Sequence, residues 1–273
     1  MDSIANYGAV TEENYTDIAP ASPIEQKEAV PQTESKEGVK QYPILDFDET
    51  KLNKLSTGVK ETLKYSKVNP AGGKIYETSK RIFDIVASVI AIVIISIPML
   101  FIMLLIYLED KGNPIFVQER LTKDGKIFRM YKLRSMCMDA EKKFKDISQE
   151  NQSDGLAFKS KNDSRITRIG HFIRKTSIDE LPQFFNVLKG DMSLIGPRPP
   201  LPREVVLYTP DQMDRLLVKG GLSCICQTEG RSDMPFDDWV ESDVRYIQTR
   251  SFRLDVLLMI KTFLAVILKK GAR

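Results

Sequence analysis

The feature that most constrains this chain is an apolar run from Ile85 to Leu108 that contains no charged side chain. A run of this length is enough for one helix to cross a bilayer. Ser96 and Pro98 lie in its middle, and a proline there removes a backbone donor and clashes with the carbonyl four residues earlier. The run therefore predicts a membrane helix that breaks or kinks at Ser96-Ile97-Pro98.

The flanks of this run bear on its topology. Basic residues precede it (Lys74, Lys80, Arg81) and follow it (Lys111, Arg120, Lys123, Lys126). A spanning helix usually has more lysine and arginine on its cytoplasmic side, and little asymmetry is seen here. The pattern favours a re-entrant helix–break–helix hairpin, with both flanks on one face of the membrane. A spanning helix kinked at the proline is the alternative.

The charge of the chain is divided along its length. The net charge is +3, but residues 1–50 hold eleven acids and three bases, which leaves +11 for the rest. A basic domain beside an apolar membrane segment favours anionic membrane lipids or a phosphorylated substrate as partners. No recognition helix or zinc-finger spacing predicts binding to nucleic acid.

The cysteines indicate a reducing, cytosol-facing compartment. Cys137, Cys224, Cys226 and the lone His171 provide neither a disulfide framework nor the spacing of a structural zinc site. We expect Cys224 and Cys226 to be two side chains on one strand face. The first thirty residues are polar and acidic, so no cleavable signal peptide is predicted.

Three regions are predicted: an acidic, disordered extension over 1–73, a re-entrant membrane helix over 74–110, and a cytosolic, membrane-associated domain over 111–273. The fold class is α+β and mainly helical. In the last region we expect a β-hairpin (114–120 and 127–133, with an Asp-Gly turn at 123–126) and amphipathic helices (168–175, 179–189, 236–248, 252–269). The final helix either lies in the membrane interface or packs on the core.

Two adjacent acids, Asp179 and Glu180, mark the first candidate site. The apolar spacing after them predicts a helix that begins at this point, and Pro182 is tolerated only near its first turn. Acids at a helix N-terminus are favoured in the ionised form. An ionised aspartate can act as a nucleophile, and two acids together can hold Mg²⁺. Ser177-x-x-Glu180 is also a capping box, which is a purely structural interpretation.

Cations make up the second candidate site. Prolines on both sides of Arg198 restrict its backbone, which suits a guanidinium that grips phosphate oxygens. Further cations occur in the same part of the sequence, and with the acid pair they indicate a site for a diphosphate substrate beside a membrane anchor: Lys132, Arg134, Arg165, Arg168 and Arg174.

Five ordered blocks closely resemble the bacterial sugar transferases, the monotopic polyprenyl-phosphate phosphoglycosyl transferases. The resemblance covers about Lys80 to Leu268 and is similar to the short form of the family, with an added extension. The blocks are Lys80–Asp84, Tyr131–Met136, Asp163–Gly170, Thr176–Gln183 and Gly196–Pro199.

The resemblance implies an enzyme of the bacterial cytoplasmic membrane whose catalytic domain faces the cytoplasm. It implies transfer of a sugar-1-phosphate from a UDP-sugar to undecaprenyl phosphate, with release of UMP, as the first step in a surface glycan. Asp179 would be the nucleophile that forms a phosphosugar adduct, Glu180 would help to position Mg²⁺ or the acceptor, and Arg174 and Arg198 would bind phosphates. Downstream glycosyltransferases or a second copy of the chain are further candidate partners.

Weaker matches implicate Gln227, Arg231, Asp243 and Asp255 in shaping the substrate pocket or in capping helices. The chain departs from the family pattern at Gly220–Cys226, where a Pro-Gly and a Thr-Gly-like stretch are usual. This departure bears on the specificity for the sugar.

The main alternative is a non-catalytic membrane scaffold that organises glycan assembly through the acidic extension. A peripheral hydrolase or kinase that phosphorylates Asp179 is disfavoured, because no P-loop or kinase glycine loop is present.

Overall fold

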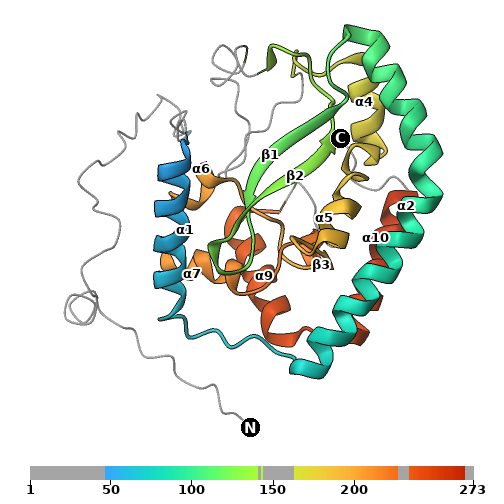
Figure 1. The fold of residues 1–273 in the computed structure, drawn as a ribbon. Helices are drawn as coiled ribbons and strands as arrows, with labels where there is room; N and C mark the ends of the chain where they lie inside the picture. The colour runs from blue at the N-terminus through green and yellow to red at the C-terminus, as the bar shows by residue number, and fades with distance from the viewer. Residues whose placement is uncertain (1–46, 141–142, 144–162, 227–233, 268–273) are drawn as a thin grey trace. The chain divides into compact units, whose positions relative to one another are not determined.

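The computed structural model describes residues 47–140, 143, 163–226 and 234–267 (Figure 1). These residues are mainly helical, with a β-hairpin and a second pair of short strands, which agrees with the predicted α+β class. They belong to one unit, Gln32–Arg273.

The N-terminal helix α1 spans Glu49–Leu63 and is capped by the Asp48 side chain, which accepts from the backbone N–H of Lys51. Its apolar face is buried against the tip of the β-hairpin and the short helices after Leu201. The prediction of a disordered extension over 1–73 is therefore wrong for its described part, because α1 buries an apolar stripe there. Residues 1–46 lie outside the described part of the chain.

The membrane segment forms one continuous helix, α2, over Lys74–Asp110, which is about 55 Å long at 1.5 Å per residue. The prediction that the helix breaks at Ser96-Ile97-Pro98 is wrong, because α2 continues through Pro98. A proline removes only one hydrogen bond and can be accommodated by bending, and Figure 1 shows that α2 changes direction along its course. The Ser96 hydroxyl donates to the Val93 carbonyl at 2.9 Å.

Both ends of α2 contact the same folded domain. Near its start, Lys80 Nζ lies 2.8 Å from Asp255 Oδ2, and Arg81 donates to the carbonyl of Val187 at 2.6 Å. At its end, Glu109 Oε1 accepts from the backbone N–H of Arg168 at 3.0 Å. Among the described helices, α2 is the one that is long and apolar enough to cross a bilayer. Whether it is re-entrant or spanning stays a prediction.

The predicted β-hairpin is confirmed. Strands β1 (Ile115–Leu121) and β2 (Ile127–Leu133) pair antiparallel, with Leu121 opposite Ile127. The turn between them is η2 (Lys123–Gly125), in which Asp124 and Gly125 both have positive φ. A side chain at Gly125 would meet Val59 of α1 at 2.9 Å, so the glycine permits both the turn and its contact with α1.

The remaining elements follow the hairpin. Strands β3 (Ser193–Ile195) and β4 (Gly221–Ser223) form a parallel pair that the sequence did not predict. The other helices and turns are α4 (Arg168–Lys175), η4 (Ile178–Glu180), α5 (Gln183–Lys189), α6 (Pro202–Val205), α7 (Pro210–Met213), η5 (Asp214–Leu217), α9 (Phe236–Thr249) and α10 (Phe252–Ile267).

Three apolar clusters join these elements. The largest packs β2, α5, β3, α9 and α10 together around Val187, Ile195 and Ile247. The second lies beneath α1. The third joins the second half of α2 to β2 and α4 through Met99, Ile106 and Leu133.

Apolar side chains remain exposed on two helices. On α2 they include Val93, Ile97 and Phe101, and on α10 they include Leu257, Ile260 and Phe263. The inner face of α10 packs on the core through Leu258. Exposed apolar stripes of this kind fit the predicted membrane interface.

Candidate active site

Helix α5 brings the acid pair to the β-hairpin. Asn186, which is fully buried, accepts from the backbone N–H of Tyr131 at 3.0 Å and donates to the carbonyl of Arg129 at 2.7 Å. This side chain therefore pairs with the backbone of β2 as a neighbouring strand would. Because α5 is fixed in this way, η4 lies against β2 immediately before it.

The acids themselves lie in the 3-10 turn η4 rather than in the α-helix predicted to begin there. Ser177, directly before the turn, has φ +56°, a conformation that is uncommon outside glycine and often marks functional sites. Its side chain makes no capping hydrogen bond, so the capping box interpretation is wrong. The predicted C-terminus is confirmed, since α5 ends at Gly190 in the left-handed conformation.

Glu180 forms an ion pair with a lysine of β2. Lys132 Nζ lies 2.9 Å from Glu180 Oε1, and the two side chains are only 16% and 26% exposed. Burial alone would raise the pKa of Glu180, but Lys132 and Arg198 outweigh burial and lower this pKa to about 2. Glu180 is therefore ionised throughout the physiological range.

Asp179 has the opposite electrostatic environment. Burial raises its pKa to about 6, the neighbouring Glu180 adds to the rise, and Lys132 and Arg174 oppose it. Two adjacent carboxylates thus have pKa values on either side of the usual range. A pair separated in this way is typical of sites where two acids have different roles.

The loop that carries Arg198 is held by hydrogen bonds on both sides of it. The carbonyl of Pro197 accepts from the backbone N–H of Gly221 at 2.8 Å, and that of Pro200 accepts from Leu121 at 3.0 Å. The carbonyl of Pro199 accepts from Arg120 at 2.8 Å. Together these bonds explain how a Pro-rich segment presents one arginine in a fixed place, as the sequence predicted.

Arg120 lines the site, although the sequence pattern indicates it only as a charge that follows the apolar run. It is buried, and burial together with Arg198 lowers its pKa to about 10. Lys132 lies opposite Phe116, which is four residues before Arg120 on β1. Side chains alternate between the two faces of a strand, so Arg120 and Lys132 lie on the same face of the hairpin. The sequence predicted both strands but not their register, which is what brings Arg120 to the face of Lys132.

These side chains meet in one small cleft. It is lined by Arg120, Met130, Lys132, Glu180, Gln183, Arg198, Pro199, Gly221 and Leu222. The cleft therefore combines one ionised carboxylate with three cations, beside the second acid, Asp179. These charges suit an anionic group such as a phosphate, with a carboxylate next to it.

Other predicted site residues make different contacts. Arg134 pairs with Asp110 at the end of α2, and Arg165 pairs with Asp163 through two hydrogen bonds. Arg174 is near enough to influence the pKa of Asp179.

The two C-terminal acids among the predictions are held in ion pairs. Asp243 pairs with Arg215 at 2.7 Å, and Asp255 accepts from Lys80, Tyr76 and Tyr246. Asp255 thereby fastens the start of α2 to α9 and α10. Gln227 and Arg231 lie outside the described residues.

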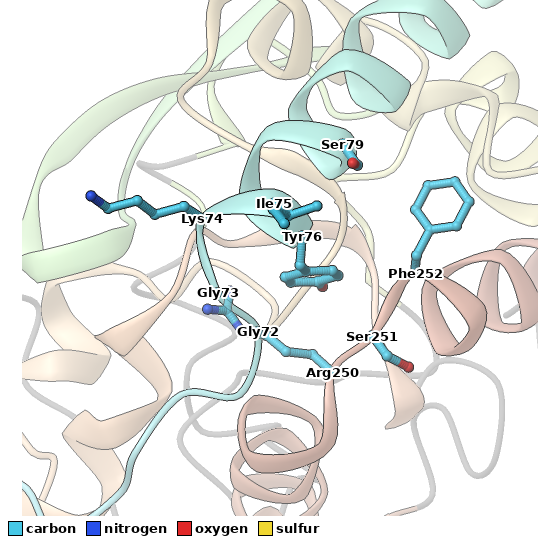
Figure 2. Close-up of a pocket in the computed structure, with 9 residues that line it drawn as sticks. All are labelled: Gly72, Gly73, Lys74, Ile75, Tyr76, Ser79, Arg250, Ser251 and Phe252. Carbon is cyan, nitrogen blue, oxygen red and sulfur yellow. The ribbon is translucent and has the colours of Figure 1, made fainter.

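A larger and mostly apolar hollow of about 970 Å³ opens at the start of α2 (Figure 2). None of the predicted site residues that the structure describes lines it. Arg250 stacks on Tyr76 with 5.4 Å between the guanidinium carbon and the ring centre, donates to the Ala71 carbonyl and pairs with Glu77. This arginine therefore has a structural role at the α2 N-terminus.

Comparison with known proteins identifies the family of this chain. The model of the family described as "Bacterial sugar transferase" matches residues 75–269. The chain belongs to this family. The match begins at the second residue of α2 and includes every residue that lines the cleft, whereas α1 lies outside it.

Curated members of the family include close relatives. The galactosyl transferase CpsE of Streptococcus agalactiae is 46% identical over 196 residues, which is 71% of this chain and 43% of the relative. The undecaprenyl-phosphate galactose phosphotransferase of Salmonella typhimurium is 40% identical over 200 residues, 71% of this chain and 41% of the relative. The exopolysaccharide production protein ExoY of Rhizobium meliloti is 32% identical over 209 residues, 75% and 91% respectively. The chain thus spans less than half the length of the first two.

Proposed function

We propose that this protein transfers a sugar-1-phosphate from a UDP-sugar to undecaprenyl phosphate and releases UMP, through a covalent intermediate on Asp179. The observation that carries the proposal is the cleft in which Glu180, Lys132, Arg120 and Arg198 converge beside Asp179. The names of its relatives support the acceptor, since a 43% identical protein of Aeromonas hydrophila is a UDP-N-acetylgalactosamine-undecaprenyl-phosphate N-acetylgalactosaminephosphotransferase.

In the first half of the reaction, the Asp179 carboxylate attacks the phosphorus next to the sugar. A bond forms between the carboxylate oxygen and phosphorus, and the bond to the bridging oxygen breaks, so that UMP leaves with the electron pair. Above pH 6 the carboxylate is ionised, as its pKa requires. Arg198 and Arg120 would neutralise the diphosphate oxygens and the negative charge that develops on UMP.

Mg²⁺ fits the chemistry of the acid pair. Glu180 raises the pKa of Asp179 by repulsion, so these two residues would hold a divalent cation, whose charge would relieve that repulsion. One or two carboxylates completed by substrate phosphates are a usual magnesium environment. When bound, the ion would supply charge neutralisation between the anionic nucleophile and the anionic phosphate.

In the second half, the phosphate oxygen of undecaprenyl phosphate attacks the phosphorus of the adduct. The acyl-phosphate bond breaks, which regenerates Asp179 and yields the diphosphate-linked sugar. Splitting one displacement into two allows donor and acceptor to use the same cleft in turn. The acceptor phosphate lies at the level of the lipid headgroups, so the site must lie close to a membrane surface.

A monotopic placement of α2 would meet this requirement. Both ends of the helix are bound to one domain through the Lys80–Asp255 pair and the Glu109–Arg168 contact. A helix whose ends lay on opposite faces of a bilayer would have to give up one of these contacts. We therefore propose that α2 enters and leaves on the cytoplasmic face.

A donor screen tests the proposed reaction. The protein in nanodiscs would be given Mg²⁺, undecaprenyl phosphate and single UDP-sugars, and UMP would be followed for the wild type and for Asp179→Asn. We expect release with at least one donor and its loss by about 10³-fold or more in the variant. Absence of UMP with all donors from a folded, membrane-bound protein would favour the scaffold alternative. Full activity of Asp179→Asn would refute the assignment of the nucleophile.

A further inference from the structure

A second cluster of reactive side chains lies outside the cleft. Cys224 and Cys226 follow β4 directly and are both buried, with their sulfurs 2.6 Å apart. The prediction that they share a strand face is wrong, because β4 ends at Ser223 and Cys226 is helical. Asp243 of α9 is buried beside them, and the two Sγ atoms and a carboxylate oxygen all lie within 4.8 Å of one another.

The carboxylate of Asp243 is only partly satisfied. Arg215 donates from Nε to Oδ2 at 2.8 Å, and its Nη2 lies 2.7 Å from the same oxygen. The other oxygen, Oδ1, is buried and has no hydrogen-bond partner. A buried polar atom without a partner costs free energy, so its presence calls for a ligand or another explanation.

Arg215 orients the Asp243 carboxylate by hydrogen bonds, as second residues commonly do for carboxylates that bind metals. Arg215 is itself fixed by Tyr208, whose hydroxyl lies 2.9 Å from its Nη1, and by the ring of Trp239 at 5.1 Å. The guanidinium thus holds Oδ2 and leaves Oδ1 without a hydrogen-bond partner.

We propose that Cys224, Cys226 and Asp243 form a binding site for a thiophilic divalent cation of the zinc class. Two thiolates, one carboxylate and a water are a ligand set that zinc accepts. Zinc-bound thiolates lie about 3.8 Å apart at bond lengths of about 2.3 Å, so the two cysteines would have to move apart by rotation about their Cα–Cβ bonds.

The charges of the site balance with the ion bound. Binding converts two thiols to thiolates and releases two protons to solvent. The resulting three negative charges face one divalent cation and Arg215. Because binding releases protons, uptake of the ion should strengthen as pH rises.

The ion would connect the cleft to α9. Cys224 follows β4, whose Gly221 and Leu222 line the cleft, whereas Asp243 lies on α9. The spacing of cysteine and histidine alone does not predict this site. The third ligand is separated from Cys226 by 16 intervening residues and is identified only by the fold.

Zinc retention by the full-length protein tests this site. Wild type and single variants would be purified in detergent with a non-thiol reductant, loaded with Zn²⁺, dialysed, and measured for zinc per chain. We expect about one zinc for the wild type and for Cys137→Ser, whose cysteine lies outside the cluster. Cys224→Ser and Cys226→Ser should retain at least tenfold less. A wild type without zinc, or variants that retain it equally, would overturn the proposal.

A spectrum of the unmutated site keeps the test independent of how the variants fold. Loading wild type with Co²⁺ should give a sulfur-to-cobalt charge-transfer band that Zn²⁺ abolishes and Cys137→Ser retains. Absence of the band overturns the proposal. Counting thiols on protein denatured without reductant tests whether Cys224 and Cys226 form a disulfide instead. Three reactive thiols after zinc removal support the metal site. One reactive thiol in a protein that binds no zinc overturns it.

Discussion

At the scale of single residues, the proposed covalent mechanism depends on the unequal environments of Asp179 and Glu180. A folded-state pKa of about 6 means that Asp179 resists ionisation that it would undergo near pH 4 in the unfolded chain. This residue therefore destabilises the fold increasingly as pH rises from about 4 to 6. Glu180, with its pKa lowered to about 2, stabilises the fold above about pH 4, and this stabilisation is lost as pH falls towards 2.

Two isosteric variants should consequently shift the unfolding temperature in opposite directions. Asp179→Asn removes a disfavoured charge and should raise the midpoint of thermal unfolding at pH 7. Glu180→Gln leaves Lys132 without its partner and should lower that midpoint. Differential scanning calorimetry in one detergent checks both, and a shift of the same sign in the two variants would contradict the assigned environments.

The pH dependence of UMP release should report the nucleophile. Because only the ionised carboxylate attacks, the single-turnover rate should fall about tenfold per pH unit below pH 6. Lys132 lowers the pKa of Asp179 and Glu180 raises it. Lys132→Gln should therefore move the acidic limb of the profile to higher pH, and Glu180→Gln should move it to lower pH. Coincident limbs in all three proteins would show that another group titrates.

At the scale of elements, the stability of the catalytic domain should depend on α1. Leu55 is 5% exposed and packs in the cluster beneath this helix. Leu55→Ala should reduce the free energy of unfolding by about 2 to 5 kcal/mol, whereas Lys54→Ala on the exposed face should change it by less than about 0.5 kcal/mol. Denaturant titration compares the two, and equal effects would mean that α1 is not part of the folded unit.

The elements that the sequence predicted well are those with a strong local pattern. The β-hairpin follows from alternating apolar residues around Asp124-Gly125, and the helices of the C-terminal half follow from their apolar period. The sequence indicated Lys132, Glu180 and Arg198 as parts of one site but not how they are arranged in space. The structure places all three in one cleft. The continuous course of α2 through Pro98 was missed, because a single proline does not fix whether a helix bends or ends.

Other features depend on contacts that no local pattern contains. Strands β3 and β4 are three residues each and are held by backbone bonds between Gly196 and Ser223 and between Gly221 and Pro197. Helix α1 did leave a signal, since Leu52, Leu55 and Val59 recur at helical spacing, but an acidic, Ser- and Thr-containing context concealed it. The capping box failed because Lys132, distant in sequence, binds Glu180.

At the scale of the whole molecule, the proposal that α2 is monotopic has a direct consequence for the N-terminal region. Tyr65 precedes α2 and is 65% exposed. In a Cys137→Ser background, Tyr65→Cys should be protected from a membrane-impermeant maleimide in intact cells and labelled after lysis. Labelling in intact cells would place this region outside and show that α2 spans.

The covalent intermediate on Asp179 is tested most directly by the intact mass of the protein after incubation with Mg²⁺ and its UDP-sugar, without undecaprenyl phosphate. We expect about one UMP released per chain and a mass increase of one sugar phosphate on the peptide that contains Asp179. Addition of undecaprenyl phosphate should remove this adduct. Continuous UMP release without acceptor, or full turnover with acceptor and no adduct at any time, would contradict the covalent mechanism.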